Sequence, residues 1–267
     1  SPGNDMNFST DKVEAARNFA NKVYNASRFV LMNLGEEAEE LSGKAPELSD
    51  RWILTRLNEA IRDITQHLDG CDLGLAAQRI YDFAWSEFCD WYIEWAKPRL
   101  MDGEEARKKT AQAVLLHCLK GLIRLLHPIM PFLTESIWQS LPGTEGTIML
   151  ADWPSADPAL DFSADAAQCE GVMEAIRTVR GVRAEMKVEP SRRVRLLMLP
   201  SSPQWARALA DCESAFMRMC GAAGVEILKS AGDAPGKTVS AVCPAAEILI
   251  PLGDLVDASK EIARLEK

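Results

Sequence analysis

Three asparagines, three basic side chains and a phenylalanine recur on one side of the segment from Asp11 to Leu34. At about 100° per residue they fall on one continuous arc, which in angular order holds Arg17, Arg28, Asn21, Glu14, Asn25, Asn18, Phe29 and Lys22. Asparagine is a mediocre helix former, so three in one helix suggest a purpose other than helix stability. Amide, guanidinium, ammonium and aromatic groups are those that read unstacked nucleotide bases. The alternative is an ordinary solvated face with an exposed phenylalanine.

The segment that carries this arc has the signals of a single long helix. Ser9, Thr10 and Asp11 form a capping signal, and no Gly or Pro follows until Gly35. The opposite side is apolar and is expected to face the core; its members are Val13, Ala16, Ala20, Val23, Tyr24, Ala26, Val30 and Leu31.

The overall charge limits the kind of partner. The 267 residues carry a net charge of −9, which argues against a general nucleic-acid coat protein. Residues 12–28 nevertheless hold four cations against one carboxylate, and residues 177–195 hold seven against two. Two basic islands in an acidic chain predict an anionic partner that is bound locally.

The chain has the composition of a folded soluble protein, with 47% apolar and 26% charged residues, and we expect it in the cytoplasm. Its seven cysteines are odd in number and never in CxxC spacing, which fits reduced thiols in a cytosol. No run of 18 apolar residues is present, so we expect no membrane association. The three histidines share no ligand spacing, and no metal site is predicted.

Apolar residues at helical spacing predict four further helices in the first half of the chain. They cover about 50–68, 75–96, 104–126 and 132–141, and Pro98 is expected to end or kink the third of the chain's helices. Long helices joined by short loops indicate an antiparallel helical bundle. We assign it to residues 1–147.

The second half has a different texture. After a Pro- and Asp-rich connector, the pattern predicts a small α+β domain over residues 148–253. Its helices are expected at 164–186 and 204–220, and its strands at 194–199, 225–228, 238–242 and 247–250. Arg180 and Arg183 adjoin the apolar stripe of the first of these helices, where a lone buried charge would need an acid or an anion. Residues 254–267 have near-heptad spacing and are expected to start a coiled-coil arm.

Catalytic signatures are absent from the sequence. It contains no GxxxxGK[ST], GxGxxG after a strand, HExxH or GxSxG motif. Glu87, Asp90 and Glu94 lie among aromatic residues that could raise a carboxylate pKa, but pairing within the bundle or simple exposure is the favoured explanation. We assign no catalytic residue.

Several segments, in order along the chain, resemble the C-terminal half of class I aminoacyl-tRNA synthetases, and most closely the valyl members of that family. The segments are RNFANKVYNASRFVLMNL (17–34), DRWILTRLNEAI (50–61), EFCDWYIEWAKPRL (87–100), HPIMPFLTESIWQSLP (127–142) and, more weakly, IRTVRGVRAEMKVEP (176–190) and LVDASKEIARLEK (255–267). The resemblance covers nearly the whole chain.

The resemblance implies an anticodon-binding region separated from its catalytic and editing domains. The family's HIGH and KMSKS signatures are absent here, so the chain alone is expected not to activate valine or charge tRNA. ATP and Mg²⁺ would belong to the catalytic domain of the same polypeptide, and no cofactor is expected in this part. The implied partner is tRNA(Val), and the expected state is a monomer.

The resemblance also assigns roles to individual residues. In the family the first bundle helix contacts the anticodon, a role that falls here on Asn18, Asn21, Lys22, Asn25, Arg28 and Phe29. Secondary contacts with tRNA are expected from Arg17, Trp95, Lys97, Arg99, Arg180, Arg183 and Lys187. For the 177–195 island, contact with the tRNA and salt bridges to absent domains both remain open. The alternative function is a helical protein–protein docking module anchored by Trp85, Trp91, Trp95 and Trp138.

Overall fold

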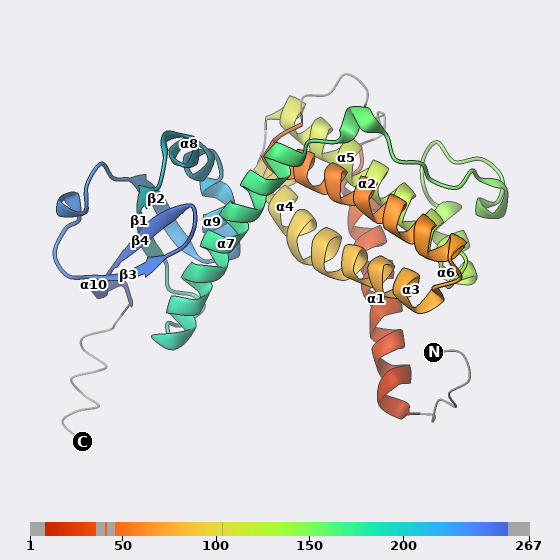
Figure 1. Cartoon of the computed structure of the whole chain (residues 1–267), viewed down its shortest axis with the longest axis horizontal. Coiled ribbons are helices and arrows are strands. Elements are labelled where there is room, and N and C mark those ends of the chain that lie inside the picture. The colour runs from red at the N-terminus through yellow and green to blue at the C-terminus, as the bar shows by residue number, and fades with distance from the viewer. Residues whose placement is uncertain (1–8, 36–40, 42–45, 103, 256–267) are drawn as a thin grey trace. The chain divides into compact units, whose positions relative to one another are not determined.

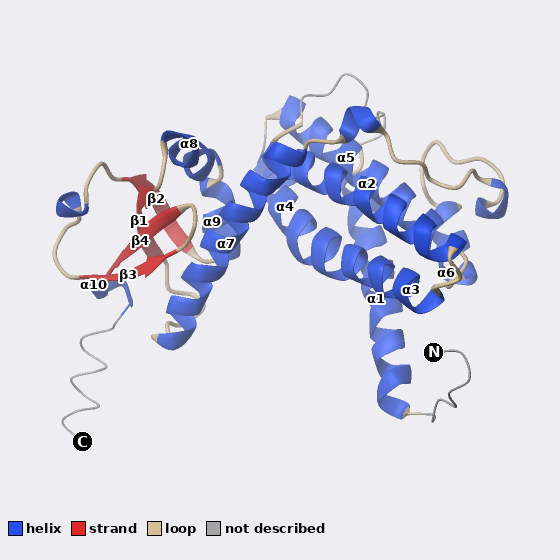
Figure 2. Cartoon of the chain, viewed as in Figure 1, coloured by secondary structure: helices blue, strands red, loops and turns tan. Residues whose placement is uncertain are grey.

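A computed structural model describes residues 9–35, 41, 46–102 and 104–255. Its contacts divide the chain into two compact units, residues 1–162 and 163–267 (Figure 1). The first unit is helical, and the strands gather in the second (Figure 2). The prediction of a helical bundle followed by a small α+β unit is confirmed.

The helices of the first unit follow the predicted order. They are α1 (Thr10–Asn33), α2 (Leu48–Asp69), α3 (Leu73–Tyr81), the π-helix η1 (Asp82–Ile93), α4 (Glu94–Asp102), α5 (Glu105–Leu126) and α6 (Pro131–Trp138). Helices α2 and α5 contact each other, and α5 buries residues around most of its circumference. A helix that is apolar on most sides must be covered by several neighbours. The core of the bundle therefore lies around α5.

The third helix runs further than the sequence predicts. Helices α3, η1 and α4 follow one another without a gap from Leu73 to Asp102. Pro98 lies inside α4, so the prediction that the helix ends near Ala96 was wrong. Within η1 the backbone has π-helical bonding, which is rare and often found at functional sites.

A buried ionic group joins α2 to α4. Asp50 is fully buried and accepts hydrogen bonds from both terminal nitrogens of Arg99, at 2.8 and 2.7 Å. The hydroxyl of Tyr92 on η1 donates to the same carboxylate at 2.7 Å. Burial lowers the pKa of Arg99, but its pairing with Asp50 outweighs that effect and raises the pKa above the usual range. The bidentate geometry satisfies a carboxylate that would otherwise be an unpaired buried charge.

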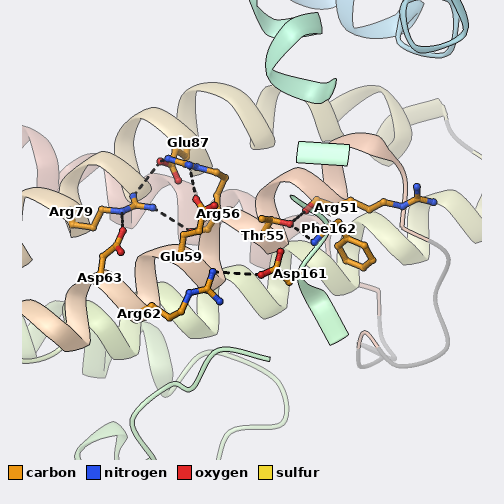
Figure 3. A network of polar contacts seen from close by, with 10 residues as sticks. All are labelled: Arg51, Thr55, Arg56, Glu59, Arg62, Asp63, Arg79, Glu87, Asp161 and Phe162. Carbon is orange, nitrogen blue, oxygen red and sulfur yellow. Dashed lines mark hydrogen bonds and ion pairs between the residues drawn. The ribbon is translucent and has the colours of Figure 1, made fainter. Parts of the chain in front are cut away.

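Residues 148–162 were assigned to the second domain, but their contacts group them with the bundle. Asn58 on α2 donates to the carbonyl of Asp157 at 2.8 Å and accepts from its amide at 3.0 Å. The amide of Phe162 donates to the Thr55 hydroxyl at 2.8 Å (Figure 3). The 3₁₀ turns η2 (Ile148–Leu150) and η3 (Pro158–Leu160) lie in this segment.

Glu87, one of the carboxylates singled out in the sequence, belongs to an ion-pair network. It accepts from Arg56 at 2.7 Å and from Arg79 at 3.2 Å, and Arg79 also pairs with Asp63 at 3.2 Å (Figure 3). The network links α2, α3 and η1, so ion pairing within the bundle accounts for the position of Glu87.

The second unit packs helices on a mixed sheet of order β2-β1-β4-β3. Strands β1 and β2 are parallel, and the other pairs are antiparallel. The predicted helix 204–220 is divided at Cys212. The elements are α7 (Ser163–Glu185), β1 (Val194–Pro200), α8 (Pro203–Asp211), α9 (Glu213–Met219), β2 (Ala222–Ile227), η4 (Ala231–Asp233), β3 (Thr238–Val242), β4 (Ala246–Pro251) and α10 (Leu252–Leu255).

Residues 256–267, where the coiled-coil arm is predicted, lie outside the described residues. Among the residues that are described, no helix is both long and apolar enough to span a bilayer.

Candidate nucleic-acid interface

A groove of about 400 Å³ lies between α1 and the continuous helix formed by η1 and α4. This volume falls in the range of ligand sites. The groove is lined by Asn18, Asn21, Lys22, Asn25, Ala26, Phe29, Trp85, Cys89, Ile93 and Lys97.

Five of the six residues predicted to contact the anticodon line this groove, namely Asn18, Asn21, Lys22, Asn25 and Phe29. The sixth, Arg28, is exposed outside the lining, with its guanidinium 6.0 Å from the ring centre of Tyr24. Arg17 is also exposed on α1. The structure thus brings together amides, an ammonium and an aromatic ring, as the arc on α1 predicts.

The inward face of α1 differs in part from the predicted apolar side. Phe19 and Ser27 are buried together with Val23, Ala26 and Val30. The Ser27 hydroxyl donates to the carbonyl of Val23 at 2.8 Å, which satisfies it inside the bundle. Three residues of the predicted apolar side, Val13, Ala16 and Tyr24, are instead exposed. Relative to the prediction, the buried face of α1 is therefore shifted around the helix toward Phe19. With this face buried, the three asparagines line the groove.

Lys22 is held between a carboxylate and an aromatic ring. Its ammonium forms an ion pair with Asp90 on η1 and lies 4.1 Å from the ring centre of Trp85. Trp85 in turn stacks on Tyr81, with ring centres 5.5 Å apart and planes inclined by 15°. A cation at this distance over a tryptophan face is attracted by the ring quadrupole.

Lys97 has a corresponding arrangement at Phe29. Its ammonium pairs with Glu94 and lies 5.4 Å from the ring centre of Phe29. Lys97 was predicted as a secondary contact, and it lines the groove with the α1 residues. Each lysine of the lining is thus associated with one carboxylate and one ring.

Cys89 contributes a thiol to the groove lining. Burial raises its pKa to about 12, an effect that the nearby Lys22 ammonium opposes and the Asp90 carboxylate reinforces. The thiol therefore remains protonated at neutral pH and behaves as an apolar wall of the groove.

Trp85, Cys89 and Ile93 line the groove although their places in the sequence did not identify them as groove residues. Together with Lys97 they recur every fourth residue. That repeat was the signal in the sequence that these residues share one face of a helix. It does not reveal which face of the helix packs near α1.

Three predicted secondary contacts need correction because their side chains are buried. Trp95 and Arg99 are 6% and 4% exposed, and Arg99 is committed to Asp50. Arg183 is 9% exposed and donates to the carbonyl of Glu189 at 3.2 Å. Burial also lowers the pKa of Arg183. None of the three presents a cation or ring at the surface.

The basic island of residues 177–195 is largely used within the second unit. Arg180 and Arg193 each donate, at 2.7 Å, to carbonyls of Met219 and Met217 at the C-terminal end of α9. Cations there are stabilised by the helix dipole. Arg195 forms an ion pair with Asp254 at 2.9 Å and lowers the pKa of that carboxyl. Lys187, the remaining predicted contact, is exposed.

Comparison with known proteins gives consistent matches. A family model described as "Anticodon-binding domain of tRNA ligase" matches residues 50–198. The valine–tRNA ligases of Clostridium acetobutylicum and Geobacillus kaustophilus are 44% and 43% identical over the whole chain. The chain spans 30% of the length of each.

Among solved structures, a LeuRS from Agrobacterium radiobacter K84 in a ternary complex with tRNA and LeuAMS matches with a TM-score of 0.45 and 21% identity. The match covers 59% of this chain and 18% of that one.

Proposed function

The chain belongs to the anticodon-binding domain family of tRNA ligases, and from this premise we propose that it binds the anticodon of tRNA(Val) as part of a valine–tRNA ligase. The observation that carries the proposal is the groove between α1 and η1, where Asn18, Asn21, Asn25, Lys22 and Phe29 converge. The family model begins at residue 50 and does not include α1. The relation of α1 to the ligases rests on the matches that cover the whole of this chain.

The groups in the groove suit an unstacked base. Each asparagine amide offers both a donor and an acceptor to a base edge. Phe29 is half-buried, so its position is fixed while part of the ring stays accessible for stacking. Arg17 and Arg28, both exposed on the same helix, would hold phosphates.

The catalysis of the parent enzyme lies outside this chain in our proposal. The parent would join valine to tRNA at the expense of ATP, with ATP and Mg²⁺ held by its catalytic domain. This chain would supply recognition and would act as a monomeric part of a cytoplasmic polypeptide, with no catalytic residue of its own.

The rival function, a protein-docking module with tryptophan anchors, is disfavoured by burial. Trp91, Trp95 and Trp138 lie in the core, and Trp85 is a wall of the groove. Docking hot spots need side chains that a partner can reach.

Fluorescence titration of the chain with tRNA transcripts that differ only in the anticodon tests the proposal. We expect tighter binding of the valine anticodon and weaker binding by Lys22→Glu. Equal affinity for every transcript would contradict base reading. A Lys22→Glu variant that binds like the wild type would show that this face is not the binding site.

A further inference from the structure

The ammonium of Lys22 has two partners on η1, and only one of them lines the groove. Trp85 is part of the lining, whereas Asp90, which forms the ion pair, is not. The carboxylate therefore holds the lysine from outside the groove while the indole supports it from within. Lys97 repeats the pattern with Glu94 and Phe29.

The stability of the bundle does not account for this ion pair. The side chains of Lys22 and Asp90 are 28% and 48% exposed, and exposed pairs add little to stability. Ordering a lysine also costs side-chain entropy. The pair joins residues 68 apart in sequence, and its clear structural effect is to fix the position of the ammonium group.

We propose that Asp90 is a positioning residue, which holds Lys22 over Trp85 so that this wall of the groove accepts an unstacked base and rejects a phosphate. The inference rests on the proposed function and deepens it. Lysine has three N–H donors; with one directed to Asp90, another can serve an acceptor on a base edge. A phosphate that approached the same ammonium would be repelled by the Asp90 carboxylate, whereas a neutral base would not.

The test compares Asp90→Ala with a matched control, Asp63→Ala, in the full chain. Asp63 likewise forms an ion pair, in its case with Arg79; its side chain is 50% exposed, and it lies outside the groove lining. Both variants lose one surface carboxylate, so effects of net charge are equal. Asp90→Glu, which keeps the carboxylate, is the rescue variant.

Two measurements on tRNA transcripts that differ only in the anticodon follow. In Asp90→Ala we expect the affinity ratio between matched and altered anticodons to fall at least fivefold. We also expect the salt slope of log K to steepen by roughly 0.7, because the released ammonium becomes a phosphate ligand. Asp63→Ala should change the ratio less than twofold, and Asp90→Glu should recover most of it.

A third measurement needs no tRNA. The rate at which an amine-reactive reagent acylates Lys22, followed by mass spectrometry, should rise at least threefold in Asp90→Ala and stay unchanged in Asp63→Ala. An unchanged rate in Asp90→Ala would overturn the positioning role.

The outcomes separate this inference from the proposed function. If the wild-type chain distinguishes anticodons and Asp90→Ala distinguishes them equally well, Asp90 has no role in reading and only this inference fails. If the wild-type chain binds all transcripts equally, the proposed function fails and this inference fails with it.

Discussion

Phe29 is the aromatic residue of α1 that both lines the groove and lies beneath a lysine, with the Lys97 ammonium 5.4 Å from its ring centre. Stacking of a base on an aromatic side chain is worth about 1–3 kcal/mol. The ring of Phe29 and the thiol of Cys89, which both line the groove, each have properties that can be tested.

Replacing Phe29 with Ala should weaken tRNA binding by about 1–3 kcal/mol, roughly 5- to 150-fold, because the stacking surface is lost. Fluorescence titration measures the change. Phe132→Ala is the matched control, since Phe132 on α6 is 90% exposed and outside the groove lining. Equal loss in both variants would mean that the effect is not specific to the groove.

Cys89 should resist alkylation at pH 8, while the exposed Cys71 reacts readily. The pKa of Cys89, about 12, leaves almost no thiolate at pH 8. Below that pKa, the thiolate fraction should rise about tenfold for each unit by which the pH is increased. Peptide mass spectrometry after timed labelling of the native chain gives both rates. Labelling of Cys89 at the rate of Cys71 would contradict the buried, protonated thiol.

The set of residues that share one face of α1 was largely predictable, because it depends only on helical periodicity. Five of its six proposed base contacts do meet at one groove. Arg99 could not be placed in this way. Its partner Asp50 lies 49 residues away in sequence, and a cation beside tryptophans is equally compatible with a surface site and a buried ion pair.

At the scale of elements, the ionic group of Asp50, Tyr92 and Arg99 fixes α2 against η1 and α4. Both charged side chains are almost fully buried. The stability of this contact therefore depends on the pair remaining intact, and removal of one charge would leave the other uncompensated.

Arg99→Leu should lower the free energy of unfolding by about 3–5 kcal/mol, because Asp50 would then be a lone buried charge. Urea denaturation followed by far-UV circular dichroism measures it. Arg107→Leu is the control: its ion pair with Glu47, at 2.6 Å, is partly exposed and should cost less than about 1 kcal/mol. A similar small loss for Arg99→Leu would contradict the account of a buried pair.

Element boundaries were predicted well where periodicity is strong, as for α5 and β3. The continuation of α4 through Pro98 was not predictable from periodicity, since proline usually ends or kinks a helix. The attachment of residues 148–162 to α2 depends on hydrogen bonds between Asn58 and Asp157. Such long-range side-chain contacts leave no periodic signal in the sequence.

For the whole molecule, the net charge of −9 limits how much affinity can come from phosphate contacts. Arginines of the 177–195 island bond to groups of their own unit, as Arg180, Arg193 and Arg195 do. Binding should consequently rely on base contacts more than on neutralised phosphates.

The slope of log K against log salt for tRNA binding should therefore be shallower than about −3, at roughly 0.7 per neutralised phosphate of a single strand. Titration at several salt concentrations measures it. Arg17→Ala and Arg28→Ala should each reduce the slope by about one phosphate contact. A slope of about −6 or steeper would indicate a broad electrostatic surface in place of a local groove.

The π-helical bonding of η1 has a consequence for how this protein tolerates changes in length. A π-helical turn accommodates an extra residue within an α-helix, so a single-residue deletion in η1 has a conformation ready to receive it, namely the ordinary α-helix. Because the return to α-helical bonding absorbs the missing residue, α3 and α4 would keep their register, and Lys97 would stay beside Phe29. A one-residue deletion in η1 is therefore expected to leave a folded bundle with both ends of the groove in place, whereas the same deletion in an ordinary α-helical stretch has no turn to absorb it.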